Sequence, residues 1–412
     1  MLPLKISLFM CVELIIINQV LSRVENTINE KAELICAQVI FHHGFRNPFS
    51  SFPTDPWKDK KHFIGGFGAL LNSGKQQQYE LGKYLRRRYL LGNERNINKM
   101  VYVQSIDDER SLMSAETAMA AFSLTDVNNS SSEHLQWQPI PVHTIPQEND
   151  YILVGTKSCA RYNHAYKMYK KSTEYKALMK KSKILYQYLE KHSGKEMKNL
   201  QSVHNLYDTL RIENLQNKTM PKWTQKVIAQ PEYESIAVLS LIRGTETPEM
   251  AHLSSGFLIR EILERFKEKI KSTLVPDRSL FFYFANDATI ARVLNVLGLF
   301  DFYIVPFAAS LHFELYKSND DLYFQIVYRN TTEENPLPLD IPMCGTKCSL
   351  EKFHEIYAKI IPTASFEEEC RIPTAFDDFK NGSLVLLVSL FMILTVIAVL
   401  SWIVTREEAD PE

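Results

Sequence analysis

The sequence lacks an excess of charge of either sign. Its 47 Lys and Arg residues are balanced by 48 Asp and Glu residues, giving a formal net charge of −1. No overall positive field therefore indicates a nucleic-acid partner. The chain also contains no internal repeat and no low-complexity tract, so neither a repeat array nor a long disordered tether is indicated.

The sequence also lacks a phosphate-loop signature. Residues 65–68 are Gly-Gly-Phe-Gly, but neither a following Lys-Ser/Thr pair nor G-x-G-x-x-G spacing accompanies them, so they indicate a plain loop. What the chain does have is length. Its 412 residues, 45% hydrophobic and 23% charged, suffice for a large core and predict two structural units.

Both ends carry apolar segments. Residues 1–22 read as a secretory signal peptide, because Lys5 precedes an apolar stretch that ends in small and polar residues. Residues 384–404 carry no charge and, at ~1.5 Å per residue, are long enough for a ~30 Å bilayer core. The charged tail 405–412 argues against a glycolipid-anchor signal. We expect a single-pass type I membrane protein, and the alternative for 384–404 is a core helix.

Of the six cysteines, Cys11 lies in the expected signal peptide, leaving an odd number in an oxidising compartment. Cys36 sits in an apolar run and is the candidate free thiol. Cys344 and Cys348 have spacing that suits a local disulfide, with a zinc site as the alternative, although no His stands at ligand spacing from them. Cys159 and Cys370 would then pair. Glycosylation sequons occur at Asn128, Asn129, Asn217 and Asn330.

The segment 39–48, Val-Ile-Phe-His-His-Gly-Phe-Arg-Asn-Pro, organises the chain. The apolar run 34–41 predicts a buried strand, and Gly44 and Pro48 end it. Two imidazoles and a guanidinium thus follow a strand, where open α/β sheets form ligand crevices. Imidazole can attack phosphorus, and Arg suits phosphate oxygens. The alternative is a polar strand end with a turn.

Two further strand ends carry polar groups. Residues 100–103 predict a strand that leads into Arg110 at a helix start, where an anion can bind; a helix-terminus salt bridge is the alternative. Residues 279–285 predict another strand, followed by Asn286 and Asp287 and then a helix. For Asp287 the alternative is an ordinary helix N-cap.

These segments resemble the histidine acid phosphatases over residues 33–372. Segment 39–48 resembles their Arg-His-Gly-x-Arg-x-Pro motif, with His43 at the nucleophile and Arg46 at the second Arg. Arg110 matches a phosphate-gripping Arg, and Asp287 matches the general acid of the family's His-Asp block. The resemblance implies hydrolysis of small phosphate monoesters through a phosphohistidine, with no metal or other cofactor.

Two residues depart from the family pattern. His42 stands at the first Arg, and Asn286 stands at the His before the acid. Both remain candidate phosphate ligands, but with weaker donors, so we expect reduced activity. Protonation of His42 in an acidic lumen would restore a charge without the guanidinium fork. The alternative function is a catalytically inactive, membrane-anchored, phosphatase-like binding protein.

The resemblance also implies an architecture. We expect a mixed α/β sheet flanked by helices, with an α-helical cap inserted at 158–245 between catalytic segments 33–157 and 246–372. Residues 250–273 predict one amphipathic helix packed on the sheet. A homodimer is an option that the sequence does not decide. The tail lacks a Tyr-based sorting signal, which leaves lysosome and cell surface both open.

Overall fold

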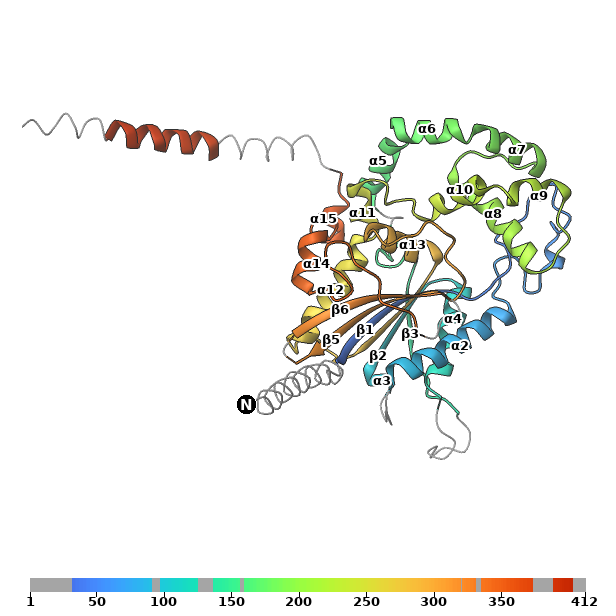
Figure 1. Cartoon of the computed structure of the whole chain (residues 1–412), viewed down its shortest axis with the longest axis horizontal. Helices are drawn as coiled ribbons and strands as arrows, with labels where there is room; N and C mark the ends of the chain where they lie inside the picture. The colour runs from blue at the N-terminus through green and yellow to red at the C-terminus, as the bar shows by residue number, and fades with distance from the viewer. Residues whose placement is uncertain are drawn as a thin grey trace, which may run out of the picture.

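The structure is a computed structural model (Figure 1). It describes residues 32–90, 97–124, 136–155, 159–319, 321–330, 335–372 and 388–402. The expected signal peptide 1–22 lies outside the described residues, as do the tail 405–412 and the sequons at Asn128 and Asn129. Asn217 and Asn330 are exposed.

A six-stranded mixed sheet forms the centre of the molecule, in the order β3-β2-β4-β1-β5-β6. Its strands are β1 (Glu33–His42), β2 (Val101–Ile106), β3 (Val142–Ile145), β4 (Leu280–Ala285), β5 (Ser310–Ser318) and β6 (Asp321–Arg329). Strands β1 to β4 are parallel, whereas β5 pairs antiparallel with both β1 and β6. The carboxyl ends of β1, β2 and β4 therefore meet at one edge, and His42 pairs in register with Ala285.

Helices cover both faces of the sheet because the central strands are apolar on both sides. On one face, Val39 and Phe41 of β1 pack with α2 (Asn72–Tyr89) and α4 (Glu109–Phe122). On the other, Cys36 and Ile40 pack with α12 (Gly256–Ile270) and α13 (Asp287–Val296). The shorter helices are η1 (Lys60–His62), α3 (Ile97–Met100), α11 (Pro248–Ser254), α14 (Leu350–Tyr357) and α15 (Phe366–Glu369). The expected mixed α/β sheet with flanking helices is confirmed.

Of the eight helices described between β3 and β4 in the chain, the first six lie to one side of the sheet (Figure 1). They are α5 (Ala160–Tyr169), α6 (Thr173–Lys181), α7 (Lys183–Ser193), α8 (Leu200–Leu215), α9 (Lys222–Ile228) and α10 (Pro231–Leu241). Most of them share a core of their own, in which Leu189, Val203, Leu206 and Tyr233 are buried. We call this set the helical insertion.

The single helix expected at 250–273 is wrong. The structure has α11, which begins at Pro248 with Thr247 as its N-cap, and then α12, which begins at Gly256. Gly256 lies against a neighbouring backbone so closely that an added Cβ would be 2.2 Å from the carbonyl oxygen of Ile360. Only glycine fits such an approach, and the helix breaks at this contact. The apolar stripe of α12 does pack on the sheet, as expected.

The expected membrane span is only partly described. Residues 388–402 form a helix with exposed side chains, whereas 384–387 and 403–404 lie outside the described residues. No helix in the described part of the chain is both long and apolar enough to cross a bilayer.

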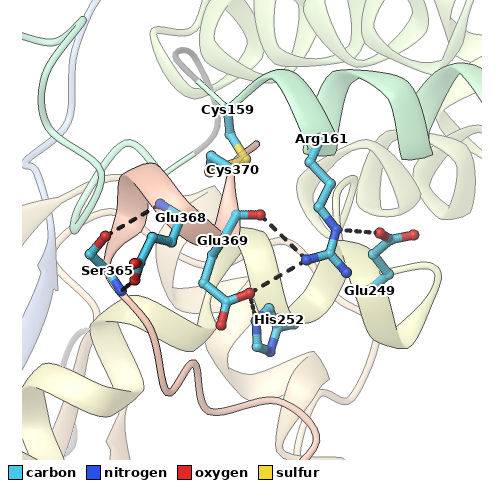
Figure 2. The surroundings of a disulfide bond; sticks show 8 residues. All are labelled: Cys159, Arg161, Glu249, His252, Ser365, Glu368, Glu369 and Cys370. Carbon is cyan, nitrogen blue, oxygen red and sulfur yellow. Dashed lines mark hydrogen bonds and ion pairs between the residues drawn. A yellow bond between two sulfur atoms is a disulfide. The ribbon is translucent and has the colours of Figure 1, made fainter. Parts of the chain in front are cut away.

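Two disulfides are present, Cys159–Cys370 and Cys344–Cys348, and Cys36 is free and buried. The first joins the N-cap of α5 to the end of α15. Figure 2 shows its surroundings, in which Arg161 bridges two elements. Arg161 pairs with Glu249 of α11 at 2.7 Å and with Glu369 of α15 at 3.4 Å. The disulfide and the ion pairs together fasten the start of the helical insertion to the end of the body.

Candidate active site

His43 follows β1 directly and is almost fully buried. Its Nδ1–H donates to the carbonyl oxygen of Gly44 at 3.0 Å, because a carbonyl can only accept. Nε2 therefore carries the lone pair. Burial, with the nearby His42 and Arg46, holds the pKa of His43 well below its usual range. The result is a neutral imidazole with one nucleophilic nitrogen.

His42 is neutral for a similar reason. Its Nδ1–H donates to the carbonyl oxygen of Pro306 at 2.7 Å, and burial lowers its pKa to about 4. In the unliganded site, a moderately acidic lumen therefore does not protonate His42. The positive charge expected on His42 from the sequence is absent. Its Nε2 is buried and has no hydrogen-bond partner in the described part of the chain.

The loop after β1 is fixed by a tight contact with the start of α2. An added Cβ on Gly44 would lie 2.3 Å from the carbonyl oxygen of Gly74, so both positions require glycine. The Gly44 N–H donates to Ser114 Oγ of α4 at 3.2 Å. His43 is thus held between β1 and the two helices on one face of the sheet.

Arg46 is buried and paired with an acid from the helical insertion. Its Nη1 and Nη2 donate to the carboxylate of Asp208 in α8 at 3.0 and 3.2 Å, and Nη1 also donates to the Asn47 carbonyl oxygen at 3.1 Å. Nε is buried without a partner among the described residues. Nε–H and the remaining N–H of Nη2 form the side edge of the guanidinium, and this fork is open.

Arg110 lies in the first turn of α4, after β2. Its Nη2 pairs with Asp108, the N-cap of that helix, at 2.9 Å, so the helix-terminus ion pair considered from the sequence is present. Its Nε is buried and has no partner in the described residues. Phe49 connects the two arginines, since the Cζ atoms of Arg46 and Arg110 lie 3.5 and 4.6 Å from its ring centroid.

Asn286, and not Asp287, is the N-cap of α13. Its Oδ1 accepts from the Thr289 N–H at 2.9 Å and from the Thr289 hydroxyl at 3.1 Å. The amide NH2 is the part of Asn286 left to donate. The alternative N-cap role of Asp287 is therefore not what the structure contains, although Asp287 Oδ1 accepts from the Ala288 N–H at 2.8 Å.

Asp287 shares its surroundings with the β1 residues. Burial acts to raise the pKa of Asp287, but the charges of His42, His204 and Arg46 outweigh it and lower that pKa below its ordinary value. Because His42 is neutral above about pH 4, the charge of Arg46 and the hydrogen bond from the Ala288 N–H are the parts of this effect that persist near neutrality. Asp287 is also one of the charges that act on Arg110.

The phenyl ring of Phe307 packs against several of these groups. Its centroid is 5.1 Å from the ring of His42, 5.9 Å from that of His43 and 5.8 Å from Arg46 Cζ. The structure thus gathers the predicted residues of two strand ends around two aromatic rings, Phe49 and Phe307. From the third strand end, the charge of Asp287 acts on His42 and Arg110. Among the described residues no group of His, Cys, Asp or Glu could hold a metal ion.

Sequence reasoning missed the contribution of α8. His204, Asp208 and Arg211 lie four and then three positions apart, so they share one helix face, and each acts on the site. His204 lowers the pKa of Asp287, Asp208 pairs with Arg46, and Arg211 lowers the pKa of His42. The polar stripe at helical spacing was the available signal. Phe49 and Phe307 gave none, because isolated aromatic residues usually indicate a core.

A surface pocket of about 740 Å³ opens beside the site. Arg110 and Phe49 line it, together with Met113, residues 64–71 and the first turn of α2. Neither His42 nor His43 lines it. Arg110 and Phe49 therefore stand between the buried histidines and the solvent on this side.

Comparison with known proteins gives a consistent result. A family model described as the histidine phosphatase superfamily (branch 2) matches residues 33–329. Human prostatic acid phosphatase is 34% identical over 344 residues, covering 82% of this chain and 88% of that protein. Rat lysosomal acid phosphatase is 30% identical over 340 residues, covering 81% of this chain and 79% of that protein.

Solved structures agree on the fold. The phytase of Hafnia alvei in complex with tartrate superposes with a TM-score of 0.58 at 16% identity, covering 83% of this chain and 99% of that chain. The phytase of Klebsiella sp. ASR1 gives a TM-score of 0.59 at 14% identity, covering 83% of this chain and 98% of that chain. At these identities the likeness shows the fold alone.

Proposed function

The chain belongs to the histidine phosphatase superfamily (branch 2), and we propose that it is an acid phosphatase that hydrolyses small phosphate monoesters through a phosphohistidine on His43. The proposal includes Arg46 and Arg110 as phosphate ligands, with His42 and Asn286 as weaker ones, and Asp287 as the general acid. No cofactor takes part in it.

One observation carries the proposal. Arg46 Nε and Arg110 Nε are buried donors with no acceptor among the described residues. The buried Nε2 of His42 likewise has no hydrogen-bond partner among them. Leaving such groups unpaired costs ~1–3 kcal/mol each. A tetrahedral oxyanion beside His43 would accept from both guanidiniums. Neutral His42, with Nδ1–H bonded to Pro306, would accept a hydrogen bond at Nε2 from a P–OH group, which favours the phosphate monoanion present in acid.

In the first step, Nε2 of His43 attacks phosphorus as the bond from phosphorus to the leaving oxygen breaks. The carbonyl of Gly44 holds the other ring nitrogen and so keeps Nε2 as the attacking atom. Arg46 and Arg110 stabilise the equatorial oxygens, where charge is spread in phosphoryl transfer. Asp287 gives its proton to the departing oxygen.

In the second step, water attacks phosphorus and gives a proton to Asp287, while the bond from phosphorus to Nε2 breaks and orthophosphate leaves. Asp287 has a lowered pKa in the free site, so it must gain its proton from acid medium or when a bound phosphoryl anion opposes its charge. The first route biases the reaction toward low pH, whereas the second keeps Asp287 protonated at a higher pH once phosphate is bound.

Reduced activity follows from the two departures. His42 is neutral where the family motif has a guanidinium, and Asn286 offers an uncharged amide. Each lost charged contact weakens transition-state stabilisation by ~1.5–3 kcal/mol, which corresponds to about ten- to a hundred-fold in rate.

The deciding assay uses p-nitrophenyl phosphate between pH 4 and 8, with wild-type protein and the His43→Ala variant. We expect turnover that is highest in acid and absent from the variant. His164→Ala is the matched control, because His164 is exposed on α5, and it should retain wild-type turnover. Turnover that persists in His43→Ala would exclude the phosphohistidine.

The second candidate function is a catalytically inactive binding protein. It is favoured by the pairing of Arg46 with Asp208, which occupies one edge of a phosphate-binding arginine, and by the burial of His43. Binding of orthophosphate or vanadate by wild-type protein with no measurable release of p-nitrophenol would select this function.

The remaining parts of the proposal concern placement. We propose that the helical insertion, expected at 158–245, caps the site through α8, and that catalytic segments 33–157 and 246–372 flank it. Residues 1–22 would direct secretion, and Asn128, Asn129, Asn217 and Asn330 would carry glycans. Residues 384–404 would anchor the protein in a membrane, leaving the catalytic part lumenal or extracellular, at the lysosome or cell surface. The oligomeric state is left to size measurements in solution, which would distinguish a monomer from a homodimer.

A further inference from the structure

Arg211 is the last of the three residues, after His204 and Asp208, that form the polar face of α8. It stands three residues after Asp208 and therefore on the same side of the helix. Its side chain is partly buried, and its guanidinium lies over Phe307, with Cζ 5.3 Å from the ring centroid. Phe307 is the ring that also packs against His42 and His43.

Among the described residues Arg211 has no acidic partner. Its guanidinium makes no hydrogen bond or ion pair with them, and it lies over the ring of Phe307. Three other arginines do have acidic partners: Arg46 pairs with Asp208, Arg110 with Asp108 and Arg88 with Glu314. A guanidinium carries five donors and a full charge, so the stacked Arg211 presents unused donors beside the histidines.

The charge of Arg211 acts on His42, the residue that stands in place of the first Arg of the family motif. Arg211 and Arg46 both act to lower the pKa of His42. Arg46 itself lies on the same ring as Arg211, with Cζ 5.8 Å from the Phe307 centroid. A guanidinium is therefore missing at position 42 of β1, while an unpaired one from α8 stands next to that position.

We propose that Arg211 binds the oxygens of the transferred phosphoryl group and replaces the guanidinium that His42 does not supply. The phosphate is then held by three arginines from three elements: Arg46 after β1, Arg110 on α4 and Arg211 on α8. This inference rests on the proposed function for its substrate class. Catalysis consequently depends on α8 in two ways, because Asp208 orients Arg46 and Arg211 binds the anion.

The test is calorimetric binding of orthophosphate at pH 6 to the full chain. Orthophosphate is a product and is not consumed, so wild-type protein can be used. The variants are Arg211→Gln, which removes the charge, and Arg211→Lys, which keeps the charge but loses the fork. Arg243→Gln is the matched control, since Arg243 also stacks on an aromatic ring, that of Tyr166 at 5.8 Å, but does not contact Phe307.

We expect Arg211→Gln to raise the dissociation constant of orthophosphate about ten- to a hundred-fold, the loss of one charged hydrogen-bonding contact. Arg211→Lys should fall between that variant and wild type, and Arg243→Gln should bind as wild type does. In the double variant His42→Arg/Arg211→Gln, the guanidinium returns to β1, and affinity should recover relative to Arg211→Gln.

An unchanged dissociation constant in Arg211→Gln would overturn the proposal, as would an equal loss in Arg243→Gln. Melting curves of each variant, with and without orthophosphate, separate a folding defect from a binding defect, because a folded protein that lacks only this contact melts as wild type does without the anion. The assay with p-nitrophenyl phosphate tests the proposed function separately. If the protein binds orthophosphate through Arg211 but releases no p-nitrophenol, the binding role of Arg211 stands and the proposed phosphatase activity is wrong.

Discussion

Arg46 and Asp208 form a buried, two-point ion pair between the loop after β1 and the helical insertion. Both terminal nitrogens of Arg46 donate to the Asp208 carboxylate, at 3.0 and 3.2 Å, across 162 residues of sequence. The side chains are 3% and 10% exposed, so neither charge is relieved by water. This contact connects the nucleophile's loop directly to α8, and it fixes which edge of Arg46 remains open.

Removal of the Asp208 charge should make the protein depend on a bound anion. In Asp208→Asn, Arg46 keeps its charge in a buried place without a counterion, which costs on the order of 3 kcal/mol of unfolding free energy. Saturating orthophosphate should then raise the melting temperature more in the variant than in wild type, because the anion replaces the carboxylate. Asp301→Asn, at an exposed position, is the control. An equal phosphate shift in all three proteins would contradict this account.

A guanidinium at position 42 should accelerate catalysis near neutrality. His42 is neutral at pH 7 because burial lowers its pKa to about 4, whereas Arg stays charged throughout. His42→Arg should raise kcat/KM for p-nitrophenyl phosphate at pH 7 about ten-fold, the lower end of what one charged contact contributes, because Arg211 already supplies a guanidinium beside this position. His164→Arg adds the same charge at an exposed position and should leave kcat/KM as it is. If both variants behave alike, position 42 does not limit the rate.

Glu213 should make stability depend on pH. This side chain of α8 is fully buried, and burial, with the neighbouring Asp55 carboxylate, raises its pKa from 4.5 to about 8. The folded protein therefore holds this proton where the unfolded chain has released it. The contribution of Glu213 to stability is fully present below pH 4.5 and is lost as pH rises to about 8. Melting temperatures measured from pH 4 to 9 should fall across this window.

The variant Glu213→Gln should flatten that fall, because glutamine mimics the protonated carboxyl at every pH. Its melting temperature should exceed that of wild type at pH 8 and approach it at pH 4. Glu232→Gln, at an exposed position on α10, should keep the wild-type slope. A slope that survives unchanged in Glu213→Gln would assign the pH dependence to other groups.

Loss of the Cys159–Cys370 disulfide should destabilise the protein without removing the site. The bridge spans 211 positions, and long closed loops give the larger stabilisations, typically ~2–5 kcal/mol. The double variant Cys159→Ser/Cys370→Ser should therefore unfold at lower denaturant concentration, with kcat at 25 °C preserved. The variant Cys36→Ser, which alters the free buried thiol, is the control for a lost cysteine outside the bridge. Unfolding midpoints in urea provide the measurement.

Much of the sheet edge was predictable, because each polar group there follows directly on an apolar strand. Residues 39–48 and Asn286 with Asp287 stand where the strand patterns end, and short-range patterns suffice for that. The break at Gly256 was not predictable, since the apolar stripe continues through it and the cause is a contact with Ile360, about a hundred positions away. The Arg46–Asp208 pair depends on a similarly distant contact. The face of α8 could have been read from the spacing of His204, Asp208 and Arg211, but the sequence alone does not show that this face meets the ends of the strands.

The bridge between Cys159 and Cys370 has a consequence for proteolysis. A protease that cuts an exposed turn between these two positions would leave both fragments covalently joined. Nicked protein would migrate as one species on a gel run without reductant and as two on a gel run with it. The arginines and the nucleophile would stay in one particle after such a cut, so clipping alone need not silence the molecule.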